Sequence, residues 1–283
     1  MKKRIYSNNF SKKQITNYVN SINNFGFIKV ENFLKKKNIS LFKDTINKIY
    51  KKSSNHSFKG IPDRDKEDKI IYNLYNKDFI FNELLVDPLI INIAKEKLND
   101  KYYRFLANSL PNFTLKYFNA RSSGNKLDLH IDSYFPYKGD QTIMMQFALI
   151  LENSYKENGC TIVVPKSHLS GTYTNRKTKN IKYLEANPGD LLIWDSRTWH
   201  GTTENKIKKS RWAIIMTLGQ WWIKPSMDIV RGLDPKMYSK LNDMQKQILG
   251  FCSITPLNEI NRINTKTGYN ELKKLHKDYG FKN

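Results

Sequence analysis

Two histidines and an aspartate have the residue types and the spacing of an iron site. His130 and Asp132 are two residues apart in the segment LDLHIDSYFP, residues 127–136. Its alternation of apolar and polar side chains predicts a β-strand that places both residues on one face. His200 ends a second predicted strand, in LLIWDSRTWHG, and strand pairing could bring it beside the other two.

Two imidazoles and one carboxylate on one face of a metal ion are the ligand set of non-haem Fe(II) oxygenases. Three protein ligands hold the ion, while the opposite three coordination positions stay open for a chelating cosubstrate and for O2. A single H-x-D pattern also occurs in many proteins that bind no metal, and a lone histidine is more often a hydrogen-bonded core or surface residue. The iron site therefore needs support from the rest of the chain.

Arg211 gives that support, because it lies eleven residues after His200 inside the otherwise apolar segment SRWAIIMTL. An unpaired buried charge is costly, so an arginine there is expected to meet an anion. A guanidinium matches a carboxylate with two parallel hydrogen bonds. The compound 2-oxoglutarate offers a distal carboxylate for the arginine and a keto acid for the iron. In the alternative, Arg211 pairs with an internal aspartate and has a structural role.

The elements expected around these residues are strands with helices on both sides of them in the sequence. Over about 10–100 the apolar residues mostly recur at a helical period, and Pro88 divides the last helical stretch in two. Over about 110–225, short runs rich in β-branched and aromatic residues alternate with turns, which predicts an antiparallel sandwich or barrel. Helical patterns resume over 226–283, so the sequence indicates one domain, residues 1–283.

Composition limits the partners and the location that we expect. The chain has 48 Lys and Arg against 26 Asp and Glu, a net charge of +22. Because the lysines are scattered and form no single stripe, nucleic-acid binding is disfavoured, and the charge reflects either compositional bias or attraction of an anionic substrate. Two cysteines without metal-type spacing, no membrane-length apolar run and no apolar secretion signal favour a cytoplasmic protein without a membrane partner.

The motifs of this chain resemble those of the phytanoyl-CoA dioxygenase family of Fe(II)/2-oxoglutarate oxygenases. The segments FGFIKVENFL, HIDSYFP, ENGCTIVVPKSH, NPGDLLIWDSRTWHG and QILGF follow in that family's order and approximate spacing. The resemblance implies a mainly β fold with flanking α-helices, a double-stranded β-helix or cupin-like jelly roll. The iron ligands that it implies are His130, Asp132 and His200. The residues that it implies for 2-oxoglutarate are Arg211, Thr202 and Gln146.

Two positions depart from the family's pattern. Lys166 stands where the family commonly has glycine, in the turn of VVPKSH, and the place of a common aromatic residue is taken by Phe147 or Ala148. The first departure concerns the loop over the pocket, and the second concerns the shape of the cosubstrate site. His168, in the same turn as Lys166, is interpreted as structural.

The sequence therefore predicts an Fe(II)- and 2-oxoglutarate-dependent dioxygenase that uses O2 to hydroxylate an unactivated C–H bond of a small molecule. By the same resemblance, related halogenases have a small residue in place of the carboxylate, so Asp132 favours hydroxylation. Residues expected near the substrate are Tyr134, Arg121 and Trp222. One alternative is a non-catalytic cupin-like small-molecule-binding protein. Another is a nucleic-acid-modifying oxygenase, which position 217 disfavours because it is Thr where that class has a second arginine.

Overall fold

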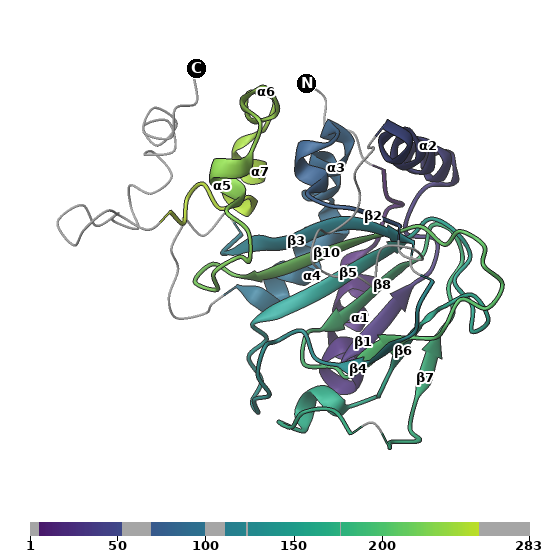
Figure 1. Cartoon of the computed structure of the whole chain (residues 1–283). Helices are drawn as coiled ribbons and strands as arrows, with labels where there is room; N and C mark the ends of the chain where they lie inside the picture. The colour runs from purple at the N-terminus through teal and green to yellow at the C-terminus, as the bar shows by residue number, and fades with distance from the viewer. Residues whose placement is uncertain (1–5, 53–68, 100–110, 123, 176, 255–283) are drawn as a thin grey trace.

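Two antiparallel β-sheets form the centre of the protein in a computed structural model that describes residues 6–52, 69–99, 111–122, 124–175 and 177–254. The larger sheet has the strand order β1-β8-β5-β10-β3-β2, and the smaller has the order β4-β9-β6-β7. Figure 1 shows the two sheets one above the other, with the larger sheet beneath most of the helices.

The chain crosses repeatedly between the two sheets. The strands of the larger sheet are β1 (Phe27–Val30), β2 (Lys69–Ile71), β3 (Phe113–Ser122), β5 (Met144–Ile150), β8 (Leu191–Asp195) and β10 (Ala213–Gln220). The strands of the smaller sheet are β4 (Leu127–His130), β6 (Thr161–Val163), β7 (Lys182–Leu184) and β9 (His200–Thr202). From β3 onward, successive strands lie in the larger or the smaller sheet in turn, with β6 and β7 as one hairpin. This is the predicted jelly roll, so the sequence-based fold class is confirmed.

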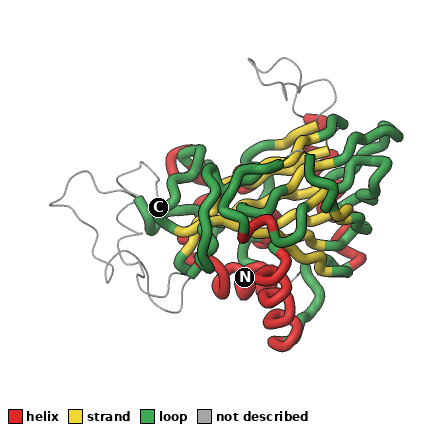
Figure 2. Tube along the Cα trace, turned by 90° about the horizontal axis from the view of Figure 1, so that it is seen from below, coloured by secondary structure: helices red, strands yellow, loops and turns green. Residues whose placement is uncertain are grey.

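Helices cover the outer face of the larger sheet. The longer ones are α1 (Lys12–Phe25), α2 (Lys36–Lys52) and α4 (Pro88–Leu98). The shorter ones are η1 (Leu74–Asn76), α3 (Phe79–Leu84), α5 (Ile229–Gly232), α6 (Pro235–Tyr238) and α7 (Asp243–Ile248). A further short helix, η2 (Ser167–Leu169), lies between β6 and β7 of the smaller sheet. Helix α1 contacts β1 and β8, and α4 contacts β5 and β10, so the main hydrophobic core lies between these helices and the sheet. Figure 2 shows the long helices gathered along one side of the strands.

The end of α1 is fixed against the segment that leads to His200. The helix begins with a reciprocal capping box between Ser11 and Gln14 and ends at Gly26, whose φ is +91°. An added Cβ on Gly26 would lie 2.6 Å from the Thr198 hydroxyl, so glycine is required there for space as well as for φ. The Gly26 carbonyl accepts a hydrogen bond from that hydroxyl at 2.9 Å, which joins the helix to the β8–β9 turn.

The predicted break at Pro88 is confirmed, because α4 begins at Pro88 and Asp87 caps it by accepting from the Leu89 N–H at 3.0 Å. The predicted helical flank after residue 226 is present as three short helices up to residue 254. Its remainder lies outside the described residues, as does the segment 53–68. Within the part of the chain that the structure describes, no helix is both long and apolar enough to cross a membrane.

Candidate metal centre

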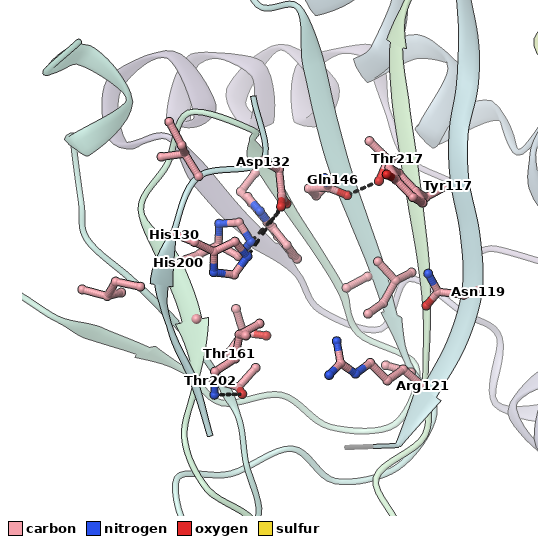
Figure 3. A pocket seen from close by; sticks show the side chains of 18 of the residues that line it. Tyr117, Asn119, Arg121, His130, Asp132, Gln146, Thr161, His200, Thr202 and Thr217 are labelled. Carbon is pink, nitrogen blue, oxygen red and sulfur yellow. Dashed lines mark hydrogen bonds and ion pairs between the residues drawn. The ribbon is translucent and has the colours of Figure 1, made fainter. Parts of the chain in front are cut away.

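The three predicted iron ligands come together at one end of the smaller sheet. Strands β4 and β9 pair so that His130 lies opposite His200, with ring centroids 4.2 Å apart. Asp132 follows β4, and its N–H donates to the Ser196 carbonyl in the β8–β9 turn at 2.8 Å. Its carboxylate lies 3.1 Å from His200 Nε2 and 3.5 Å from His130 Nε2. One potential ligand atom from each residue lies within 4.8 Å of the others (Figure 3).

Both imidazoles are oriented as metal-binding histidines are. The Nδ1 atom of His130 lies 2.9 Å from the Asp128 carbonyl, and Nδ1 of His200 lies 2.9 Å from the Thr198 carbonyl. A neutral imidazole that donates from Nδ1 keeps the Nε2 lone pair for a metal ion. Both Nε2 atoms face the Asp132 carboxylate, so these residues fit a divalent metal ion of the Fe(II) type.

The charge state of Asp132 also suits a ligand. Burial by itself would raise the pKa of this carboxyl group, but the His200 and His130 imidazoles lower it well below its usual range. Burial also acts to lower the pKa of His130, yet the neighbouring Asp132 carboxylate raises it overall. The aspartate is therefore an anion at neutral pH and can coordinate a cation without first losing a proton.

A cavity of about 700 Å³ extends from these residues between the two sheets. Cross-strand register arranges nine of the residues that line its wall on the larger sheet in three rows. The row nearest the metal centre is Tyr117, Thr217 and Gln146. The middle row is Asn119, Ile215 and Ala148, and the last row is Arg121, Ala213 and Ile150. The larger sheet therefore lines the cavity along its length, while the smaller sheet carries the histidines.

The three residues implied for 2-oxoglutarate all line this cavity. Gln146 is 5% exposed and accepts a hydrogen bond from the Thr217 hydroxyl, which fixes its amide in the row beside the metal centre. Thr202 lies on β9 two residues beyond His200, and its hydroxyl accepts the Leu127 N–H at 3.1 Å. Because this hydroxyl accepts in that bond, its own hydrogen remains available to donate to a ligand in the cavity that Thr202 lines.

Arg211 lies two residues before β10, so it precedes the strand that the sequence predicts it to occupy. Its backbone N–H donates to the Ser122 hydroxyl at 2.9 Å. Its guanidinium packs over Gly159, where an added Cβ would lie 2.7 Å from the Arg211 Nε. Gly159 thus leaves the space in which the arginine can reach the cavity.

Two of the three residues predicted near the substrate line the cavity, and one does not. Arg121 and Tyr134 are in its wall. Trp222 lies outside the residues that line the cavity: its indole N–H donates to Gln220 Oε1 at 2.6 Å, and its ring is 50% exposed, so its role near the substrate stays a prediction. That hydrogen bond folds the side chain back along the end of β10, a direction that strand alternation does not reveal.

Tyr134 forms part of a hydroxyl cluster at the cavity mouth. Its side chain is 58% exposed, and its hydroxyl lies 3.1 Å from the Ser226 hydroxyl. Ser226 also hydrogen-bonds the hydroxyl of Tyr117, the row residue nearest the metal centre. The mouth is thereby built from three segments: β3, the loop after Asp132 and the segment after β10.

Lys116, on β3, hydrogen-bonds the segment that follows β10. Its side chain is almost fully buried, and its ammonium donates to the Thr114 hydroxyl at 2.7 Å and to the Ile223 carbonyl. Burial lowers the pKa of Lys116 to about 7. The start of the segment after β10 is therefore held by a buried amine whose charged form is disfavoured by burial.

We predict that Lys116→Met changes how stability depends on pH. Between about pH 7 and pH 10 the unfolded chain binds a proton at Lys116 that the folded chain does not, so the wild-type free energy of unfolding rises with pH relative to the variant. The relative gain should reach a few kcal/mol, since each pKa unit corresponds to about 1.4 kcal/mol. Urea titrations of both proteins at several pH values measure it. A difference that is independent of pH would contradict the depressed pKa.

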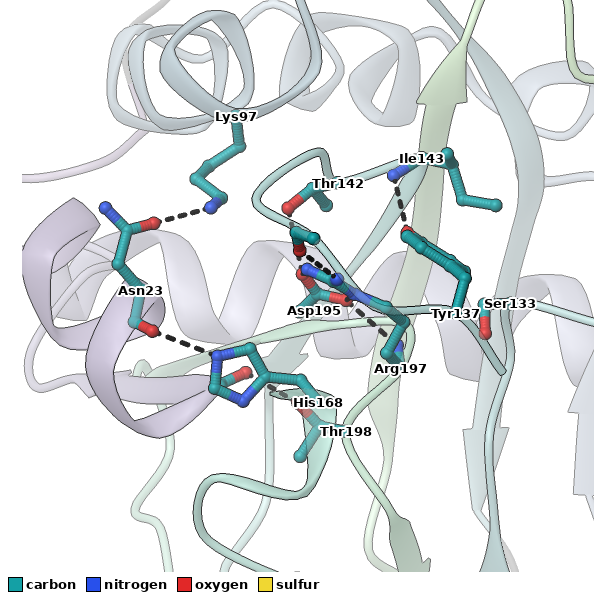
Figure 4. A network of polar contacts seen from close by, with 12 residues as sticks. Asn23, Lys97, Ser133, Tyr137, Thr142, Ile143, His168, Asp195, Arg197 and Thr198 are labelled. Carbon is teal, nitrogen blue, oxygen red and sulfur yellow. Dashed lines mark hydrogen bonds and ion pairs between the residues drawn. The ribbon is translucent and has the colours of Figure 1, made fainter. Parts of the chain in front are cut away.

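A buried ion pair behind the cavity holds the turn that contacts two metal-site residues. Arg197 donates to the Asp195 carboxylate from Nε at 3.0 Å and from Nη2 at 2.8 Å. The Thr142 hydroxyl donates to the same carboxylate at 2.8 Å, and Arg197 Nη1 donates to the Gly139 carbonyl at 2.7 Å (Figure 4). The guanidinium also lies 4.5 Å from the centre of the Tyr137 ring.

This network supports the metal centre through the backbone. The turn containing Asp195 and Arg197 supplies the carbonyl that accepts from the Asp132 N–H and the carbonyl that orients the His200 ring. His168 lies nearby, with Nε2 3.0 Å from the Asn23 carbonyl on α1, and takes no part in the metal centre. The structural role predicted for His168 is consistent with this position.

We predict that Arg197→Gln lowers the free energy of unfolding by about 3–5 kcal/mol, because it leaves the buried Asp195 carboxylate without its partner. The matched control is Arg231→Gln, which removes the surface pair of Arg231 with Asp228 and should cost less than about 1 kcal/mol. Chemical denaturation of both variants measures the difference. Equal losses in the two variants would contradict the role of the network.

Among the cavity residues that sequence reasoning overlooked are the polar side chains of Tyr117, Asn119 and Thr161. Asn119 Oδ1 is buried and has no hydrogen-bond partner among the described residues, so it is a polar atom facing the site. The period-2 alternation of FTLKYFNARS contained the signal, since Tyr117, Asn119 and Arg121 must share one face of that strand.

Solved structures with the same fold include proteins that hold a metal ion, 2-oxoglutarate and a further small molecule. HygX from Streptomyces hygroscopicus, solved with nickel, 2-oxoglutarate and hygromycin B, is 13% identical with a TM-score of 0.58, and the match covers 79% of this chain and 95% of that one. The epimerase SnoN, solved with Fe³⁺, α-ketoglutarate and nogalamycin RO, is 13% identical with a TM-score of 0.58, and the match covers 74% of this chain and 85% of that one. At such identities the likeness shows the fold.

Sequence comparison gives the family. The relative named dioxygenase af480, from Aspergillus fumigatus, is 24% identical over 195 residues, which are 64% of this chain and 60% of that protein's length. The uncharacterized protein Rv1501 from Mycobacterium tuberculosis is 25% identical over 264 residues, 89% of this chain and 92% of that protein. The sequence model of phytanoyl-CoA dioxygenase matches residues 22–213, which include every residue of the metal centre. The chain therefore belongs to the phytanoyl-CoA dioxygenase family.

Proposed function

We propose that this dioxygenase depends on Fe(II) and 2-oxoglutarate and hydroxylates an unactivated C–H bond of a small molecule. The observation that carries the proposal is the metal centre itself, in which two Nε2 atoms and an anionic carboxylate lie within 4.8 Å of one another at one end of the cavity. Bound iron would supply the redox chemistry with O2, and 2-oxoglutarate would supply two electrons as it is converted to succinate and CO2.

The protein's own residues bind and orient the reactants. His130, Asp132 and His200 would hold the metal, and Gln146 would offer its amide beside it. Arg211 would bind the distal carboxylate of 2-oxoglutarate with two hydrogen bonds, and the Thr202 hydroxyl would donate a third. Position 217, where nucleic-acid-modifying oxygenases have a second arginine, holds a threonine that donates to Gln146, which disfavours that class.

We propose that the substrate enters at the mouth, where Tyr134 and Tyr117 present hydroxyl groups and aromatic faces near the metal centre. Relatives of this fold that hold hygromycin B or nogalamycin RO support a small molecule of some size. The net charge of +22 favours an anionic one, because a positive surface potential raises its local concentration.

The test is turnover of 2-oxoglutarate. Fe(II)-loaded protein should release succinate when O2 and 2-oxoglutarate are supplied, and a panel of small molecules should reveal the substrate class as an increase in that release. A metal chelator should stop the reaction. Binding of small molecules without any succinate release, across the whole panel, would favour a non-catalytic binding protein of the same fold.

A further inference from the structure

The deep end of the cavity contains a second arginine. We propose that Arg121 binds the distal carboxylate of 2-oxoglutarate together with Arg211, so that this carboxylate lies between two guanidinium groups. The inference rests on the proposed function and extends it, because it changes the role expected for Arg121 from substrate binding to cosubstrate binding.

Strand register places Arg121 at the end of the cavity opposite the mouth. On the larger sheet, Arg121 pairs with Ala213 in the last row, whereas Tyr117 pairs with Thr217 beside the metal centre. On the smaller sheet, His200 pairs with His130 at the metal centre, and Thr202, two residues further along β9, pairs with Thr161. Arg121 and Thr202 therefore lie at the same end of their sheets, away from the metal.

The side chain of Arg121 extends into the cavity. Its neighbours in the wall include Ala213 in the same row and Ala148 in the next, and these short side chains leave room above β10 and β5. Figure 3 shows the guanidinium of Arg121 reaching across that space from β3 toward Thr202 and Thr161. A long side chain at position 213 would occupy part of this path.

The two ends of the cavity are complementary to the two ends of 2-oxoglutarate. The metal centre suits the keto acid, and the opposite end gathers Arg121, Arg211 and the hydroxyls of Thr161 and Thr202. A carboxylate has two oxygens with about four acceptor positions, enough for two guanidinium groups and a threonine. The substrate is expected at the metal end of the cavity, because the mouth lies there: its residues Tyr134 and Ser226 are hydrogen-bonded beside Tyr117.

The experiment compares two keto acids that differ in the distal carboxylate. The intact protein is loaded with Ni(II) to prevent turnover, and calorimetry measures its affinity for 2-oxoglutarate and for 2-oxopentanoate, which has the same chain length but no distal carboxylate. Arg121→Gln should weaken 2-oxoglutarate binding by roughly ten- to a hundredfold, as expected for loss of a charged hydrogen bond. It should leave the affinity for 2-oxopentanoate unchanged.

Two further variants make the result specific. Arg121→Lys should restore part of the lost affinity, because an ammonium keeps the charge but not the planar two-point contact. Lys126→Gln is the matched control: it removes a positive charge that pairs with Asp128 at the surface, outside the cavity wall, and should not change either affinity.

Several outcomes would overturn the inference. Unchanged 2-oxoglutarate affinity in Arg121→Gln would show that this arginine serves another ligand, and equal weakening of both keto acids would show a structural role. A loss in Lys126→Gln as large as that in Arg121→Gln would show a long-range charge effect. If the wild-type protein binds neither keto acid, the proposed function fails as well, which separates that result from the others.

Discussion

His200→Ala is expected to abolish stable metal binding and all turnover of 2-oxoglutarate. The change removes one of three ligands, and it removes the imidazole whose Nε2 lies 3.1 Å from the Asp132 carboxylate. Two remaining protein ligands from one short segment hold a metal ion poorly. Dialysis of metal-loaded protein followed by elemental analysis measures the effect, with the expectation that the variant retains almost no metal.

The matched control for this prediction is His168→Ala. His168 is also a buried histidine, but it hydrogen-bonds the Asn23 carbonyl and lies outside the metal centre. This variant should keep the wild-type metal content even where its stability is lower. Wild-type metal content in His200→Ala, or an equal loss of metal in the two variants, would contradict the assignment of His200.

Asp132→Gly is expected to abolish hydroxylation while it weakens metal binding less than His200→Ala does. The variant keeps both imidazoles, and each still donates from Nδ1 to a backbone carbonyl, so two ordered ligands remain. Mutation of a residue that only hydrogen-bonds a metal ligand typically lowers activity roughly 10–100-fold. Because Asp132 is itself a ligand, its loss should lower activity by more than that. Succinate release and metal content, measured on the same preparation, separate the two effects.

Asp128→Asn is the control for Asp132→Gly. The Asp128 side chain is exposed and pairs with Lys126 at 3.1 Å, while only its backbone carbonyl orients His130. The asparagine variant keeps that carbonyl and should keep both metal and activity. If Asp128→Asn lost activity and Asp132→Gly kept it, the ligating carboxylate would be that of Asp128, and the assignment of Asp132 would be wrong.

Local spacing was enough to predict part of the site. His130 and Asp132 are two residues apart on a predicted strand, and strand geometry alone places them on one face. The position of His200 beside them depends on the pairing of β4 with β9, which joins segments far apart in the sequence. Resemblance to a family, rather than periodicity, supplied that contact, whereas the apolar segment around Arg211 already indicated that this arginine meets an anion.

Other features depend on tertiary contacts that a sequence does not display. The segment WDSR shows Asp195 and Arg197, but the burial of the pair depends on the loop that carries Thr142. Lys166 has a φ of +65°, which explains why its turn resembles one that commonly has glycine. The sequence also does not show the direction of the Trp222 side chain, which hydrogen-bonds Gln220 at the end of β10.

The measurement that tests the central claim most directly is the affinity for 2-oxoglutarate with and without a divalent metal ion. If the keto acid chelates a metal held by His130, Asp132 and His200, loading the protein with Ni(II) should strongly tighten 2-oxoglutarate binding. The same addition should have no effect on His200→Ala. An affinity for 2-oxoglutarate that does not depend on metal, or one that metal increases equally in wild type and His200→Ala, would contradict the account.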